Sequence, residues 1–134
     1  FQSSLNALKK SYLQKIPEKI QKLRDFVQNL KISDDPKDTN SAMQNSEFLR
    51  FLHSFKGSSG TYGFSNLHIL CQKLEQIIKK ELQNQNYLRK EVVDYIQLWI
   101  EIIEGCIEKE SLTFEVKKKD WDRLNQMEEY LKNL

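Results

Sequence analysis

Glycine, proline and cysteine are scarce in this chain, and it contains no long apolar run. The 134 residues include four glycines, two prolines and two cysteines. Few turn formers and few alternating β-branched runs favour helices and argue against a β-rich fold. No apolar run approaches the ~20 residues that span a bilayer, so no membrane insertion by this segment is expected. Cys71 and Cys106 lack metal-ligand spacing and are predicted to be reduced core residues of a cytoplasmic protein.

The charges of the chain nearly balance. Lysine and arginine total 21 against 19 aspartates and glutamates, which gives a formal net charge of +2. Because the two signs are interspersed and form no basic block, nucleic acid is not expected as a partner. The length suits a single domain over residues 1–134. Nothing in the pattern requires a dimer, so a monomer is expected. The chain begins with Phe1 rather than methionine, and we expect it to be a segment of a longer protein.

Apolar residues recur at intervals of three and four, which predicts amphipathic helices. The first stripe consists of Leu5, Leu8, Tyr12, Ile16, Ile20, Leu23, Val27 and Leu30. Pro17 lies within this segment and is compatible with a kinked helix or with the first turn of a second helix. We expect a kink or break there. The polar segment 33–40 contains Pro36 and has no apolar period, so it is predicted to be a loop.

A second helix is predicted from about Ser41 to about Gly60. Its inward-facing residues are predicted to be Phe48, Phe51, Leu52, Phe55 and Ser59. Gly60 and Gly63 are typical of a helix exit and a tight turn, after which Ser65 or Asn66 is expected to cap a third helix. Because the link is short, the two helices should be antiparallel neighbours.

Further apolar stripes predict three more helices. In the third helix the stripe comprises Leu67, Leu70, Cys71, Leu74, Ile77, Ile78 and Leu82. The fourth is predicted at about 88–109, before an irregular link at 111–114. A last stripe comprises Trp121, Leu124, Met127, Leu131 and Leu134, and Trp99 and Trp121 are expected to be packing residues. We therefore predict an all-α fold, an antiparallel up-and-down four-helix bundle over about 5–109 with an additional C-terminal helix over about 117–133.

Three residues of the second helix share one face. Lys56 and Gly57 lie one turn after His53, so a cation stands beside the imidazole and the missing side chain leaves the ring accessible. A glycine inside a helix is about 1 kcal/mol less favourable than alanine, so Gly57 has a reason to be there, either access or close helix packing. A lone histidine is usually a surface or core residue, and His68 is interpreted as a surface residue.

These residues resemble a known family. The run His53–Ser59, followed by Gly63 and by the segment Cys71–Glu75, is similar to the histidine phosphotransfer (HPt) domain of two-component phosphorelays. The run 53–57, continued by 60–65, also resembles the phosphoacceptor domain of chemotaxis-type histidine kinases, which has a fifth helix. The close resemblance covers about two helices, and the outer helices agree only in pattern. It leaves open whether the chain is a stand-alone carrier or a domain of a chemotaxis-type or hybrid kinase.

The resemblance implies that His53 accepts a phosphoryl group and exchanges it with the aspartate of a response-regulator receiver domain. In this family a glutamate or glutamine on the adjacent helix approaches the histidine, which points to Glu75 or Gln72 as the imidazole-orienting residue. Pairing of Glu75 with Lys79 on its own helix is the alternative. The residues expected to stabilise the phosphoryl group and give access to it are Lys56, Gly57 and Ser58.

The partner surface and the cofactor requirement follow from the same resemblance. Receiver domains dock on a mixed apolar face around the ring, for which Leu49 and Phe64 are candidates, although Leu49 is equally compatible with burial at the edge of the stripe. No carboxylate cluster suggests a metal site, so no cofactor is expected and Mg²⁺ should belong to the receiver. Without a Gly-rich phosphate loop the chain is predicted to be a carrier supplied by a histidine kinase, not a kinase itself. A binding-only helical module is the remaining alternative.

Overall fold

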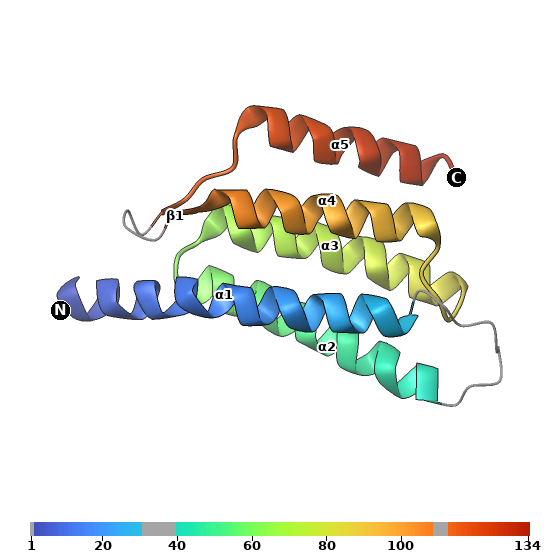
Figure 1. Ribbon diagram of the computed structural model, residues 1–134, viewed down its shortest axis with the longest axis horizontal. Coiled ribbons are helices and arrows are strands. Elements are labelled where there is room, and N and C mark those ends of the chain that lie inside the picture. Colours follow the sequence, from blue (N-terminus) through green and yellow to red (C-terminus); the bar gives the residue numbers. More distant parts are fainter. Residues whose placement is uncertain (1, 31–39, 109–112) are drawn as a thin grey trace.

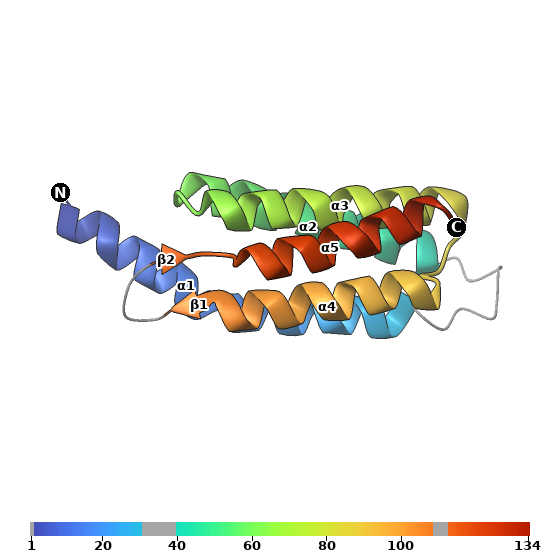
Figure 2. The same cartoon turned by 90° about the horizontal axis from the view of Figure 1, so that it is seen from above.

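The computed structural model describes residues 2–30, 40–108 and 113–134 of the chain. The helices are α1 (Gln2–Leu30), α2 (Asn40–Thr61), α3 (Ser65–Asn84), α4 (Lys90–Cys106) and α5 (Lys118–Lys132). Successive helices run in opposite directions, and α5 lies along α3 and α4 (Figures 1 and 2). The predicted all-α bundle with an additional C-terminal helix is therefore confirmed.

A short strand pair was not predicted. β1 (Ile107–Glu108) and β2 (Thr113–Phe114) pair antiparallel, with Ile107 opposite Phe114. The fourth helix thus ends at Cys106, before the predicted end near residue 109, because the chain turns into this pair. The predicted loop at 33–40 lies outside the described residues except for Asn40, which begins α2. Residues 111–112 of the predicted irregular link also lie outside them.

The core is built from one apolar stripe of each bundle helix. Its largest fully buried side chains are Trp99, Tyr95, Phe48, Phe55, Ile16, Ile20, Leu23, Leu30, Leu52, Leu67, Leu70 and Leu74. Both cysteines are free and buried, as predicted. The Trp99 indole also donates a hydrogen bond to the Leu70 carbonyl over 2.8 Å, so its polar atom is satisfied inside the core.

The first helix differs from its prediction in two respects. Pro17 lies inside one continuous helix, so a break at that residue is wrong. In Figure 2 the dark-blue N-terminal part of α1 is inclined to the light-blue part beside α4. Leu5 and Leu8 are 39% and 53% exposed instead of buried. This end of α1 projects beyond the turn between α2 and α3, away from the other described helices (Figure 1).

The turn between α2 and α3 positions the two helices of the motif. Gly63 adopts a φ of +83°, a left-handed conformation that favours glycine. The predicted cap at Ser65 or Asn66 is wrong, because the residue that precedes α3 is Phe64 and it makes no side-chain capping hydrogen bond. Phe64 is instead buried, with its ring stacked on Tyr12 at 5.8 Å between centroids. Hydrophobic packing therefore fixes the entry into α3.

A carboxylate from α3 holds the start of α4. Glu81 is only 3% exposed and accepts hydrogen bonds from the Arg89 backbone N–H (3.0 Å) and from its guanidinium (3.0 Å from Nη2). The hydrogen bond and the charge of Glu81 raise the pKa of Arg89. Because Arg89 is held in an extended conformation (ψ 156°), α4 begins at Lys90, slightly later than the predicted start at about Leu88.

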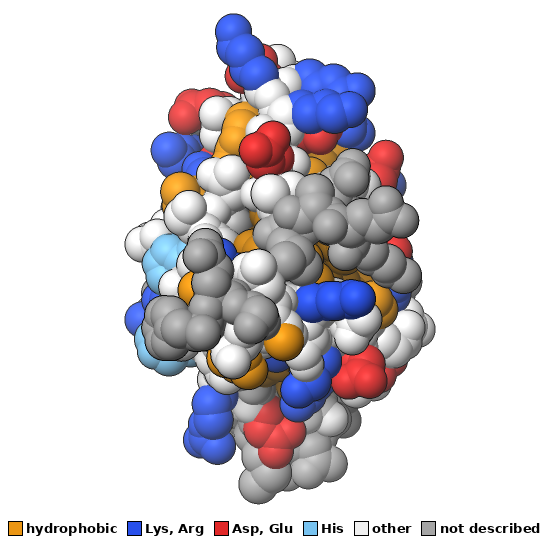
Figure 3. Space-filling view, turned by 90° about the vertical axis from the view of Figure 1, so that its left-hand side faces the viewer, with side chains coloured by type: hydrophobic (Ala, Val, Ile, Leu, Met, Phe, Trp, Pro, Cys, Tyr) orange, Lys and Arg blue, Asp and Glu red, His pale blue; other side chains and the backbone are white. Residues whose placement is uncertain are grey.

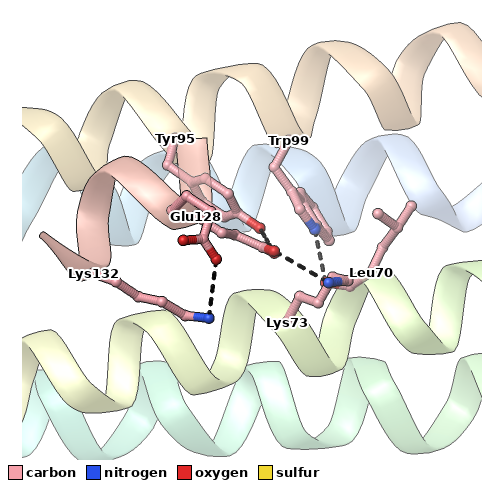
Figure 4. Close-up of polar contacts among 7 residues, drawn as sticks. Leu70, Lys73, Tyr95, Trp99, Glu128 and Lys132 are labelled. Carbon is pink, nitrogen blue, oxygen red and sulfur yellow. Dashed lines mark hydrogen bonds and ion pairs between the residues drawn. The ribbon is translucent and has the colours of Figure 1, made fainter. Parts of the chain in front are cut away.

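A second shared carboxylate docks α5. The Tyr95 hydroxyl of α4 donates to Glu128 Oε1 over 2.9 Å, and Lys73 Nζ of α3 donates to Oε2 over 3.2 Å (Figure 4). Leu124 of α5 is fully buried beside this polar contact. Leu134, predicted to extend the apolar stripe, is 52% exposed because it lies beyond the end of α5.

Candidate functional site

The site centres on an exposed imidazole on α2. The His53 side chain is 73% exposed, and its Nδ1 lies 3.2 Å from Glu75 Oε2 on α3. Because a carboxylate only accepts, this contact assigns the ring proton to Nδ1 and leaves a lone pair on Nε2. The neutral ring is therefore held at Nδ1, and its Nε2 keeps a lone pair that can act as a nucleophile. In the end-on view of Figure 3, histidine side chains reach the molecular surface.

Glu75 joins the ring to a cation. Its second oxygen, Oε1, accepts a hydrogen bond from Lys56 Nζ over 3.0 Å. The side chains of Glu75 and Lys56 are 16% and 20% exposed, so this ion pair is largely shielded from water. Glu75 thus pairs across to α2, and the alternative pairing with Lys79 on its own helix is not formed. With a neutral ring, the three groups carry no net charge.

The glycine beside the ring borders open space. A Cβ built on Gly57 would meet no atom of the described residues within 4 Å. Close helix packing is therefore the wrong explanation for this glycine. Gly57 lies one turn after His53 on the same face, so its missing side chain leaves room next to the imidazole.

Ser58 faces a different neighbour. Its hydroxyl lies 2.8 Å from the Tyr12 hydroxyl of α1 and donates to the Phe55 carbonyl over 3.2 Å. Five residues on from His53, Ser58 lies about 140° around the helix, so the two side chains do not share a face. Ser59 also lies 2.8 Å from the Tyr12 hydroxyl. Burial raises the pKa of Tyr12, although both serine hydrogen bonds act in the opposite direction.

The two predicted docking residues have different surroundings. Leu49, one turn before His53, is half-buried against the core, so part of it remains available beside the ring. Phe64 is only 5% exposed, and its prediction as an exposed docking residue is wrong, because Tyr12 and the α2–α3 turn enclose it. Gln72 is exposed one turn before Glu75, and of these two candidates it is Glu75 that bonds to the His53 ring.

His68 was not recognised as part of this region. It is half-buried, and its Nδ1 donates to the Lys56 carbonyl over 2.9 Å, so its interpretation as a surface residue without partners is wrong. A Cβ on Gly60 would lie only 3.0 Å from this Nδ1. The sequence signal was therefore Gly60 on α2, a second glycine of the motif that faces α3.

Within the described ranges no group of three or more His, Cys, Asp or Glu residues is arranged to hold a metal ion. No described helix is both long and apolar enough to cross a membrane.

No solved structure matches the chain. The family model described as the Hpt domain matches residues 7–108, which include α1 to α4 almost completely and leave α5 outside. The chain therefore belongs to the Hpt domain family.

Proposed function

We propose that His53 accepts a phosphoryl group and exchanges it with the aspartate of a response-regulator receiver domain. Membership of the Hpt family supports histidine phosphotransfer within a phosphorelay, carried out by a phosphocarrier. The observation that carries the choice of residue is the 73% exposed His53 ring, bonded through Nδ1 to Glu75. The other histidine, His68, has its Nδ1 committed to a main-chain carbonyl and is half-buried.

The transfer step follows from the proton on Nδ1. The Nε2 lone pair attacks the phosphorus of the receiver's aspartyl phosphate, forming an N–P bond while the P–O bond to the aspartate breaks. The aspartate leaves as a carboxylate. The phosphorylated ring, still protonated on Nδ1, carries a positive charge that the Glu75 carboxylate offsets until the proton passes to solvent. The same step in reverse returns the phosphoryl group to a receiver.

Lys56 and Glu75 have complementary roles in this proposal. Glu75 orients the ring and favours the nucleophilic tautomer, and Lys56 Nζ, 3.0 Å from Glu75 Oε1, supplies positive charge next to the transferred oxygens. Because the pair is mostly shielded from solvent, its electrostatic effect is stronger than that of a fully exposed pair. The bonding of Ser58 to Tyr12 and Phe55 favours a structural role for that hydroxyl.

Gly57 and Leu49 fit the approach of a receiver domain. The open space at Gly57 admits the partner's active site to Nε2, and the half-buried Leu49 offers an apolar contact one turn away. The Mg²⁺ used in such a transfer is assigned to the receiver. A histidine kinase is proposed as the original phosphoryl donor, through a receiver or directly.

The decisive experiment is phosphoryl transfer from a labelled receiver domain to the chain and to His53→Gln. We expect acid-labile, alkali-stable label on the wild-type chain and none on the variant, with both proteins equally helical by circular dichroism. Absence of label on the folded wild-type chain, from a panel of phosphorylated receivers and histidine kinases, would contradict the proposal. That result would favour a binding-only helical module.

A further inference from the structure

His68 and Glu75 reach α2 from the same side of α3. They are seven residues apart, which is about two helical turns, so their side chains lie along one face. Both contact the same residue of α2: Glu75 bonds to the Lys56 ammonium (3.0 Å), and His68 Nδ1 bonds to the Lys56 carbonyl (2.9 Å). Lys56 is therefore held by α3 at its main chain and at the tip of its side chain.

Gly60 makes the main-chain contact possible. In an α-helix the Lys56 carbonyl accepts the N–H of the residue four positions on, which is Gly60, and its second lone pair remains for another donor. A Cβ on Gly60 would lie 3.0 Å from His68 Nδ1 and 3.6 Å from its Cγ and Cε1. The ring occupies the space that a side chain at this position would need. Gly57, by comparison, borders open space, so the two glycines have different functions.

The hydrogen bond has a defined direction. Because a carbonyl only accepts, His68 Nδ1 carries a proton. The chain of contacts then runs from His68 through Lys56 and Glu75 to His53 Nδ1. A lysine side chain has four rotatable bonds, and its ammonium is directed reliably only if its main chain is fixed as well.

We propose that His68 is a positioning residue for phosphoryl transfer, which fixes the main chain of Lys56 so that the ammonium stays on Glu75 beside the reacting imidazole. The inference rests on the proposed function of His53. His68 does not touch the phosphoryl group; it acts through Lys56. Its loss should therefore lower the rate of the transfer step without weakening the docking of the receiver.

The first test compares His68→Leu, which keeps bulk but lacks a donor, with His68→Asn, whose amide nitrogen takes a position similar to Nδ1. Transfer from a phosphorylated receiver is measured over a range of receiver concentrations. We expect His68→Leu to lower the maximal rate roughly three- to tenfold, as for loss of one positioning hydrogen bond, with an unchanged half-saturating concentration. His68→Asn should recover most of the rate. A wild-type rate for His68→Leu would overturn the proposal.

A double-mutant cycle separates positioning from general loosening of the bundle. If His68 acts through Lys56, adding His68→Leu to Lys56→Met should leave the residual transfer rate unchanged. If His68→Leu lowers the transfer rate by the same factor with and without Lys56→Met, the proposal is overturned and a purely structural role is indicated. Gly60→Ala disturbs the same contact from α2, because its Cβ would lie 3.0 Å from His68 Nδ1. It should slow transfer in the wild-type background but not in combination with His68→Leu. A wild-type chain that takes no label at all would instead overturn the proposed function of His53.

Discussion

Two carboxylates on neighbouring surfaces of the bundle make almost the same contacts and have different surroundings. Glu75 accepts from Lys56 (3.0 Å) and from the His53 ring (3.2 Å), and Glu128 accepts from Lys73 (3.2 Å) and from the Tyr95 hydroxyl (2.9 Å). The two glutamate side chains are 16% and 17% exposed. We call these groups the α2–α3 clasp and the α5 clasp.

The rings distinguish the two clasps. The His53 side chain is 73% exposed, whereas Tyr95 is fully buried. Burial and the nearby Glu128 carboxylate raise the pKa of Tyr95, so its hydroxyl remains a neutral donor. An exposed imidazole held through Nδ1 keeps a free nucleophilic nitrogen, and a buried phenol held through its only polar atom keeps none. Under the proposed function, access to the ring, more than the carboxylate and lysine around it, separates the reacting site from a docking contact.

The largest effect is expected at the α2–α3 clasp. Glu75→Ala removes the acceptor for Nδ1, and the phosphorylation rate of His53 should fall roughly 10- to 100-fold, by analogy with the loss of a carboxylate that orients a metal-binding histidine. Glu75→Gln keeps an acceptor and loses the charge, so its rate should lie between those of the wild type and of alanine. Rates are measured with a phosphorylated receiver, and circular dichroism checks the fold.

Glu128→Ala is the matched control for that prediction, because it removes the equivalent carboxylate of the α5 clasp. Its transfer rate should equal that of the wild type. If Glu75→Ala transfers at the wild-type rate, or if both alanine variants slow transfer equally, the functional difference between the two clasps is lost.

The next effect concerns stability at the α5 clasp. Glu128→Ala leaves the buried Tyr95 hydroxyl without its acceptor, and the free energy of unfolding should fall by about 1–3 kcal/mol. Tyr95→Phe, which removes the donor and leaves a carboxylate still bonded to Lys73, should have a smaller effect. Urea denaturation followed by circular dichroism gives both values. A stability of Glu128→Ala equal to that of the wild type would mean that α5 does not depend on this contact.

The α2–α3 clasp was predictable because its residues follow local rules. Helical spacing places Lys56 and Gly57 one turn from His53, and a short link with Gly63 makes the next helix an antiparallel neighbour. These two facts bring Glu75 or Gln72 alongside the ring, and the structure shows that Glu75 makes the bond. The sequence resemblance pointed to the same residues.

The remaining features depend on partners that periodicity does not identify. In the α5 clasp, Glu128 bonds to residues 33 and 55 positions away, with no local pattern to mark them. The exposure of Leu5 and Leu8 depends on where the neighbouring helices end, which a stripe of apolar residues does not state. The burial of Phe64 depends on Tyr12, on another helix. The period of the apolar residues thus predicts which face of each helix is buried. Which polar and terminal residues contact that face depends on the tertiary structure.

The smallest effect is expected at the glycine beside the exposed ring. Gly57→Ala meets open space, so the better helix propensity of alanine should raise the free energy of unfolding by up to about 1 kcal/mol. The added methyl group stands one turn from His53, where we propose that a receiver domain approaches, so the half-saturating receiver concentration for transfer should rise. Urea denaturation and transfer kinetics measure the two changes on the same protein. A destabilised Gly57→Ala variant would show that close packing holds this glycine after all, and an unchanged half-saturating concentration would separate its role from access to the imidazole. Opposite changes in stability and transfer are expected only where a residue serves the partner's approach and not the fold.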